Sequence, residues 1–222
     1  RKAVLVVKAM SAWPNLSELL GDFGNARVGL VGAPLAAGSV TPGRCDLAPA
    51  ALRGVLRRIG RFDIETGREI EARVHDHGDA AIAGMSIEQA TGPIREAVSA
   101  SVAEHALTVV IGGNNAVTRP AVHGLGLPLE QVGLVTLDAH LDMRDLDGGL
   151  GNGNPVRALI EDGLPGRNIA QIGLAPFANS LAMHRDAAAA GNRLVTIAEV
   201  NRHGIAWAVG EALAHLDHVA AI

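Results

Sequence analysis

The stretch "VGLVTLDAHLDMRD", residues 132–145, joins a run of apolar residues to a cluster of charged ones. Its first half is rich in Val and Leu, which is typical of a strand covered on both faces in a parallel sheet. Two aspartates and a histidine follow at once. In open α/β sheets, ligands bind beyond the carboxyl ends of the strands. The stretch therefore predicts a buried strand with a functional site at its end.

The rest of the chain repeats this alternation of strand and helix. Further apolar runs are "RVGLVG" (27–32), "LTVVIGG" (107–113), "IAQIGL" (169–174), "RLVTI" (193–197) and "HVAAI" (218–222). Helices are expected between them at 46–59, 86–105, 154–163, 180–191 and 205–216. Asp46 and Ser86 are the expected N-caps, and Gly92-Pro93 is expected to interrupt the second helix. The pattern predicts an α/β fold, a three-layer α/β/α sandwich with a mainly parallel central sheet.

Composition narrows the class of protein. The chain has 222 residues, of which 48% are apolar and 19% charged, with a net charge of −4. We expect a single soluble domain over 1–222, with residues 1–25 as an appended N-terminal segment. The scattered basic residues argue against nucleic-acid binding, and no apolar run reaches the roughly 18 residues of a membrane helix. The single cysteine allows no internal disulfide, which suits the cytoplasm.

The two ends of the chain are unusual. It begins with Arg1 rather than Met and stops at "LDHVAAI", within the expected strand 218–222. We therefore expect a longer natural protein, truncated here at its C-terminus.

Asp138, His140 and Asp142 are the first candidate site residues. If the chain stays extended through residue 142, these side chains share one face, because strand side chains alternate. Crowded carboxylates raise one another's pKa, and a divalent cation removes that cost. Carboxylate with imidazole suits manganese, zinc or iron, and a carboxylate can bridge two ions. The alternative is structural: Asp138 caps a turn, His140 is half-buried, and Asp142 is solvated.

Two other polar stretches need an interpretation. In "IGGNN", Gly112 and Gly113 end a strand and allow a sharp turn or a close backbone approach, and Asn115 follows. In "HDHGD", His75 and His77 are either functional or part of a polar turn. The remaining histidines outside the 138–142 cluster are interpreted as surface or structural residues.

These motifs together resemble a known family. "GAPLAAGSVTPGRCDLAPAALR", "HDHGD", "IGGNN", "LDAHLDMR", "NGNPVRALIEDG" and "AQIGLAPFANS" occur in the order found in ureohydrolases, the arginase, agmatinase and formimidoylglutamase family. The likeness covers about residues 27–222, and "GLAPFANS" with Met143-Arg144 is closest to the formimidoylglutamase branch. The resemblance implies a hydrolase acting on C–N bonds other than peptide bonds in a small linear amidine, with two manganese ions, and a trimeric or hexameric assembly.

The resemblance also implies roles for single residues. Asp138 would bridge the two manganese ions, His140 would bind one, and Asp142 would bind the other alongside Asn115. A hydroxide formed from the bridging water would attack the central carbon of the substrate. The implied substrate-binding residues are Arg144, Asn152 and Asn154, and the implied loop-shaping residues are Gly112, Gly113, Gly151 and Gly153. Arg144 could pair bidentately with a substrate carboxylate, or form a surface salt bridge to Asp145 or Asp147.

The sequence also departs from the family pattern. Asn115 and Asn152 stand where family members or some of their branches carry histidine, and the second aspartate pair of the family would lie beyond residue 222. Two hypotheses follow. The first is an active metal-dependent hydrolase with a formiminoglutamate-like substrate, ahead of agmatine or arginine. The second is a non-catalytic relative that has lost a metal ligand and serves as a ligand-binding or partner subunit.

Overall fold

Parallel β-sheets form the centre of the molecule in the computed structural model, which describes residues 13–41 and 43–222. The N-terminal sheet has the order β1-β5-β2-β6, and all its pairings are parallel. Its strands are β1 (Leu20–Gly21), β5 (Val74–Asp79), β2 (Val28–Ala33) and β6 (Leu107–Gly112). Part of the expected N-terminal appendage is thus integrated into the fold, because β1 pairs with β5.

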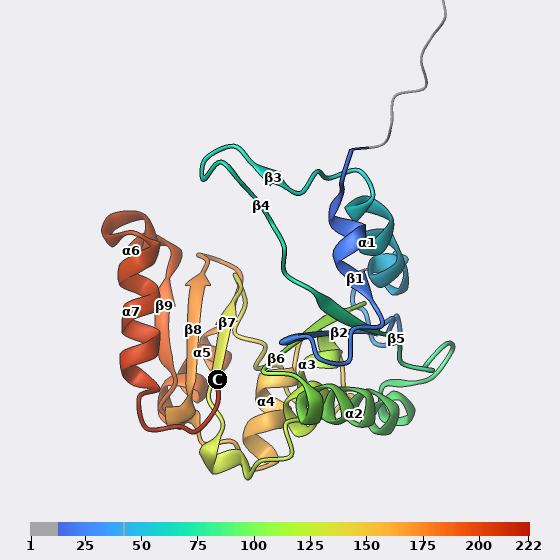
Figure 1. Ribbon diagram of the computed structural model, residues 1–222. Coiled ribbons are helices and arrows are strands. Elements are labelled where there is room, and N and C mark those ends of the chain that lie inside the picture. Colours follow the sequence, from blue (N-terminus) through green and yellow to red (C-terminus); the bar gives the residue numbers. More distant parts are fainter. Residues whose placement is uncertain (1–12, 42) are drawn as a thin grey trace, which may run out of the picture.

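A second parallel sheet follows along the chain, with the order β7-β8-β9. It contains β7 (Leu134–Leu137), β8 (Ile169–Leu174) and β9 (Arg193–Thr196). Among the described strands, β6 pairs only with β2 and β7 only with β8, so each leaves one edge without a full ladder. The expected strand 218–222 is reduced to a single parallel bridge between Ala221 and Val132 at the start of β7. Figure 1 shows the C-terminus beside β7.

Helices cover both sheets, which confirms the layered α/β class. They are α1 (Ala48–Leu56), α2 (Ile87–Glu104), α3 (Thr118–His123), α4 (Pro155–Glu161), α5 (Leu181–Ala190), α6 (Ile197–His203) and α7 (Ile205–His215). Short 3-10 turns are η1 (Leu16–Leu19), η2 (Cys45–Leu47), η3 (Asn115–Val117), η4 (Leu129–Gln131) and η5 (Gly166–Asn168), and β3 (Phe62–Asp63) forms a hairpin with β4 (Arg68–Glu69). No helix among the described residues combines the length and apolar character needed to cross a bilayer.

Buried aliphatic side chains attach these helices to the sheets. Ile94 and Val98 of α2 lie in one hydrophobic cluster, Leu159 of α4 in a second, and Ala208 and Ala212 of α7 in a third. Burial of one such aliphatic side chain contributes about 1.5–3 kcal/mol. The second and third clusters lie on the C-terminal sheet, which Figure 1 shows beside α6 and α7. The cores therefore fix the strand ends from which the polar loops emerge.

Local predictions were partly correct. Ser86 is the N-cap of α2, and its side chain accepts a hydrogen bond from the Gln89 backbone. Asp46 was wrong as a cap: the N-cap of α1 is Leu47, and Asp46 instead pairs with Arg44. The expected break at Gly92-Pro93 was also wrong, because α2 is continuous there. Its buried face outweighs the one backbone hydrogen bond that proline removes.

Arg53 on α1 clamps β5 through ion pairs with two aspartates of that strand. It donates to both oxygens of Asp76 at 2.8 Å and to Asp79 at 2.5 Å. The Arg53 guanidinium holds the pKa of Asp76 below its usual value. Arg53→Ala leaves these carboxylates uncompensated, so we expect a loss of about 1.5–3 kcal/mol in the free energy of unfolding at pH 7. Urea denaturation measures this loss.

The effect has a defined pH dependence. Because the pKa of Asp76 is lower in the folded state, its ionised carboxylate stabilises the fold at pH values above its unfolded-state pKa. This stabilisation is lost as the pH falls below about 4. Arg57→Ala, on the exposed end of the same helix, is the matched control. Equal losses in the two variants, or a loss at Arg53 that is unchanged at low pH, would contradict the clamp.

Candidate functional site

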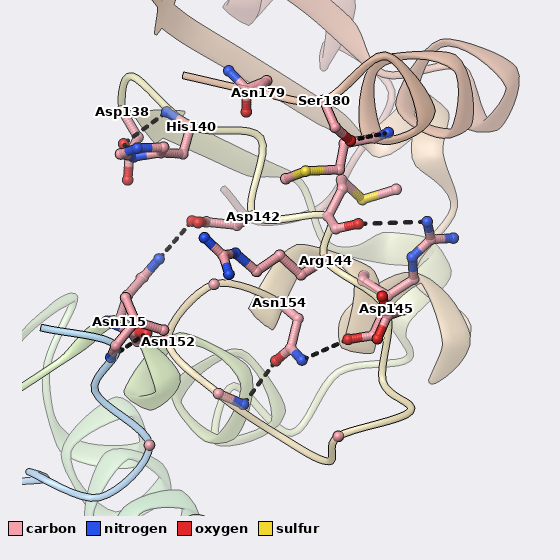
Figure 2. Close-up of a pocket in the computed structure, with 18 of the residues that line it drawn as sticks. Asn115, Asp138, His140, Asp142, Arg144, Asp145, Asn152, Asn154, Asn179 and Ser180 are labelled. Atoms are coloured by element: carbon pink, nitrogen blue, oxygen red, sulfur yellow. Dashed lines mark hydrogen bonds and ion pairs between the residues drawn. The ribbon is translucent and has the colours of Figure 1, made fainter. Parts of the chain in front are cut away.

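A cavity of about 1130 Å³ opens where the loops after β6 and β7 meet. Its walls include most of the residues that the sequence singled out, and Figure 2 shows how they face it. They are Asn115, Asp138, His140, Asp142, Arg144, Gly151, Asn152, Gly153 and Asn154. Residues more than 20 positions apart in the chain thus share one space, as expected for the carboxyl ends of parallel strands.

Asp138 and His140 form one pair at the wall of this cavity. Asp138 follows β7 directly, and its Oδ1 accepts from the backbone N–H of His140 at 2.9 Å. The same oxygen lies 3.1 Å from His140 Nδ1. The carboxylate therefore shapes the turn and orients the imidazole, whose side chain is 58% exposed. A half-buried histidine, the structural alternative, is not what the structure shows.

Asp142 lies apart from this pair. The prediction that the segment stays extended through residue 142 was wrong: β7 ends at Leu137, and Asp142 has a left-handed φ of 53°. Asp142 is 6% exposed, so it is not the solvated residue of the alternative interpretation either. Its Oδ2 accepts from Asn115 Nδ2 at 2.5 Å. The four candidate metal ligands thus form two pairs, Asp138 with His140 and Asn115 with Asp142.

Electrostatics indicate that the cavity suits a cation. The pKa of Asp142 is raised to about 6, mainly by burial and then by the nearby Asp138 carboxylate, whereas the Asn115 hydrogen bond and the interactions with His140 and Arg144 oppose the shift. A divalent ion would remove both causes of the increase. Two carboxylates, one imidazole and one amide are also a donor set that manganese accepts. The residues present therefore fit the metal that the sequence predicts.

The orientation of Asn115 bears on this fit. Its amide nitrogen faces Asp142, and its Oδ1 accepts from Thr118 Oγ1 at 2.7 Å. Only the oxygen of an amide binds a hard cation. A half rotation of the amide would direct Oδ1 toward Asp142 and the cavity.

Side-chain amides, of which Gln171 and Asn192 are buried, position the loop between Asp138 and Asp142. Asn179 accepts from the Leu141 backbone N–H at 2.7 Å and donates to the Ala139 carbonyl at 3.0 Å. Gln171 donates to the Leu141 carbonyl at 2.9 Å, and Asn192 donates to Gln171 in turn. These roles were not predicted from the sequence. A polar Gln171 within the apolar run "IAQIGL" was the available signal, because a buried amide needs partners.

Arg144 extends along the cavity wall toward Asp142 (Figure 2). The alternative salt bridge to Asp145 or Asp147 is not formed, since no carboxylate of the described residues lies within 4.0 Å of its guanidinium. Its stem rests on Gly153, where a Cβ would come within 2.8 Å of Arg144 Cδ. The glycine makes room for the arginine.

Asn152 and Asn154 organise the loop beneath Arg144. Asn152 Oδ1 accepts from the Val40 backbone at 3.3 Å and joins the two loops that flank the cavity. Asn154 is 5% exposed, donates to two backbone carbonyls at 3.0 Å and accepts from Gly151 at 2.8 Å. Because all its polar atoms are engaged, Asn154 shapes the loop. A direct substrate contact by either asparagine stays a prediction.

The other glycines differ in their surroundings. Gly112 and Gly113 do not line the cavity. A Cβ on Gly113 would lie 2.1 Å from the Leu35 carbonyl oxygen, so that glycine permits a close approach of two backbones. A Cβ on Gly151 would meet only ordinary contacts, the nearest at 3.7 Å.

Phe177 at the cavity rim was not anticipated. It is fully exposed and has a φ of 63°, a conformation that bulky residues rarely adopt. Such outliers gather at binding sites. Phe177 therefore joins the candidate substrate-contacting residues.

Known proteins are similar to this chain in sequence and in fold. A profile of the arginase family matches residues 26–222. Formimidoylglutamase from Halalkalibacterium halodurans is 30% identical over 193 residues, which cover 85% of this chain and 60% of that protein. The chain thus spans about 60% of the length of the curated relatives it matches first.

Solved structures agree with these matches. Formimidoylglutamase from Bacillus subtilis superposes with a TM-score of 0.83 at 23% identity, covering 96% of this chain and 70% of that one, a likeness of fold. Trypanosoma cruzi formiminoglutamase with Mn2+ gives a TM-score of 0.82 at 25% identity, covering 91% and 71%. Since the family profile extends over nearly all the described residues, the chain belongs to the arginase family.

Proposed function

We propose that this chain carries the metal- and substrate-binding cavity of a manganese-dependent hydrolase that cleaves a C–N bond in a linear amidine. The observation that carries the proposal is the single cavity shared by the two ligand pairs and the unpaired guanidinium of Arg144. Relatives named formimidoylglutamase, agmatinase and guanidinobutyrase support the reaction class. Formiminoglutamate is the favoured substrate, because several of the relatives and solved structures that the chain matches are named formimidoylglutamase or formiminoglutamase.

Asp138, His140, Asp142 and Asn115 would hold the manganese. When bound, manganese would act as a Lewis acid and would lower the pKa of a metal-bound water toward neutrality. Asp138 keeps the His140 ring oriented through its turn contacts. Asn179 and Gln171 hold the loop that carries these residues, so the ligands are positioned before any substrate arrives.

Arg144 would bind the other end of the substrate. A guanidinium pairs with a carboxylate through two parallel hydrogen bonds, which fixes orientation as well as position. With the carboxylate held there, the amidine end of an amino-acid substrate points toward the ligand pairs. Phe177, exposed at the rim, would be available to contact the substrate.

The test is a direct assay on purified protein supplied with Mn2+. Hydrolysis of formiminoglutamate to glutamate and formamide supports the proposal, and urea release from arginine or agmatine identifies another family substrate. If none is hydrolysed and only trace metal binds, the non-catalytic alternative replaces the proposal. That alternative stands second here because the named relatives are hydrolases.

Arg144→Gln gives a prediction about specificity. Loss of a bidentate pair with the substrate carboxylate is expected to lower kcat/KM for formiminoglutamate by about 10–100-fold, mainly through KM. Agmatine has no carboxylate, so any turnover of agmatine should change little. Arg167→Gln, remote from the cavity lining, is the control. An equal fall in kcat/KM for both substrates would show that Arg144 does not bind the substrate carboxylate.

Asn115→His tests the weak ligand position. An imidazole binds manganese more strongly than a neutral amide, so Mn2+ affinity is expected to rise by about tenfold or more. Equilibrium dialysis measures this change, with Asn201→His on the exposed face of α6 as the control. Unchanged affinity would mean that residue 115 is not a ligand position.

Further properties stay predictions. We propose that residues 1–222 form one arginase-like domain; of the segment 1–25 expected as an appendage, Leu20–Gly21 belong to the sheet, and residues 1–12 lie outside the described residues. A trimer or hexamer and a cytoplasmic location are likewise predictions from the sequence.

A further inference from the structure

A second cluster of potential metal ligands lies toward the amino-terminal ends of β5 and β6, whereas the cavity lies beyond the carboxyl ends of the strands. His75 and His77 are the second and fourth residues of β5, so both point from the same face of that strand. Glu104 and His105 end helix α2, immediately before β6 begins. The cavity residues instead follow the ends of their strands. This histidine cluster consists of His75, His77, Glu104 and His105.

The cluster is compact enough to hold one ion. One ligand atom from each of its four residues lies within 4.8 Å of the others. The Nε2 atoms of His77 and His105 are 3.0 Å apart, and Glu104 Oε2 lies 3.9 Å from His105 Nε2. Two nitrogens bound to a tetrahedral zinc ion at 2.0–2.1 Å are separated by roughly 3.3 Å. Small side-chain rotations would therefore suffice to close a coordination shell.

His105 is already oriented as a ligand. Its side chain is fully buried, and its Nδ1 lies 2.8 Å from the Ala26 carbonyl oxygen. Since a carbonyl only accepts, Nδ1 carries the proton and Nε2 presents a lone pair toward His77. Metal-binding histidines in proteins are commonly fixed in this way by a backbone carbonyl.

The surroundings preserve space for the rings. Gly29 lies opposite His75 in the strand register, and a Cβ there would come within 2.5 Å of His105 Cδ2. His75 is largely buried, and its Nδ1 makes no hydrogen bond among the described residues, although Asp22 Oδ1 lies 3.5 Å away. A buried nitrogen without a partner is costly unless something binds it.

We propose that the histidine cluster is a second metal site, which takes a divalent ion of the zinc class and joins the start of β5 to the end of α2. Three imidazoles and one carboxylate fill a tetrahedral shell, so the site is structural rather than catalytic. Zinc, nickel or copper suit imidazole better than manganese does. Burial and the neighbouring histidines lower the pKa of His77, which keeps its imidazole in the neutral form that binds metal.

The experiment separates this site from the cavity. Metal-free protein with Asp138→Ala and His140→Ala, which disable the cavity site, is titrated with Co2+ and then with Zn2+. One ion per chain is expected, with the intense visible absorption of tetrahedral Co2+, and Zn2+ should displace it and raise the Tm. In the same background, His77→Ala is expected to weaken Zn2+ binding by at least about 100-fold, beyond the usual effect of losing an outer-shell partner. His203→Ala, an exposed histidine on α6, is the matched control.

A second variant keeps the proposal testable. Glu104 is 55% exposed, so Glu104→Gln should fold normally and still weaken binding if His77→Ala proves unstable. The proposal is overturned if the cavity-disabled protein binds no ion, or if His77→Ala and Glu104→Gln bind as tightly as their background. Because the readouts are spectra, stoichiometry and Tm, failure of amidine hydrolysis would leave this inference unaffected.

Discussion

Asp138→Ala is expected to abolish manganese-dependent turnover, with a loss on the order of a thousandfold or more, as for removal of a key electrostatic group. The substitution removes a carboxylate from the ligand set and also the acceptor that orients His140. His140→Ala should have a similar effect on kcat. Metal content and steady-state kinetics on the purified variants measure both losses.

A neighbouring aspartate provides the control for this loss. Asp147 is exposed and does not line the cavity, so Asp147→Ala should retain activity, metal content and circular dichroism. Full turnover in Asp138→Ala or His140→Ala, with metal content unchanged, would refute the role assigned to that residue.

Asp142→Asn should stabilise the metal-free fold while removing metal binding. The folded-state pKa of Asp142 is raised from 3.8 to about 6. Because the pKa of Asp142 is higher in the folded state, protonation of this carboxyl stabilises the fold. This stabilisation is fully present below the unfolded-state pKa and is lost as the pH rises through about 6. At pH 7 the buried charge therefore costs about 2–3 kcal/mol, and asparagine removes it. Asparagine also tolerates the left-handed φ of 53° at this position.

Urea denaturation with a chelator checks this prediction at two pH values. The gain should be about 2–3 kcal/mol at pH 7 and close to zero near pH 3, where both side chains are neutral. With Mn2+ the order should reverse, because only the wild-type protein gains binding energy. Exposed Asp145→Asn is the control. Equal stability of the variant and the wild type at pH 7 would contradict the buried-charge argument.

The sequence predicted the strands well where their residues are apolar and the strand is buried. β2, β6, β7, β8 and β9 were found because β-branched apolar runs mark strands covered on both faces. β5 was missed as a strand because "VHDHGD" is polar. Its side chains are stabilised by the Arg53 clamp and by other imidazoles, and these long-range contacts leave no periodic signal.

The site was predicted in its residues rather than in its geometry. The spacing of Asp138, His140 and Asp142 suggested one extended face, but the chain turns after Leu137. Asp138 itself caps that turn, as the structural alternative held, because its Oδ1 accepts from the His140 backbone N–H. The rest of the loop is held by Asn179 and Gln171, which are distant in sequence, so no local pattern could reveal its path. The pairing of Asn115 with Asp142 depends likewise on how the two sheets are placed.

Among the described residues, β6 and β7 are edge strands of separate sheets, and the cavity draws side chains from the loops after both. Asn115 follows β6, whereas Asp138 and Asp142 follow β7. The distance between Asn115 and the two aspartates therefore depends on the distance between the N-terminal and C-terminal sheets. Free strand edges offer backbone donors and acceptors to any additional parallel strand. A change in the distance between β6 and β7 would therefore change the distance between Asn115 and Asp142.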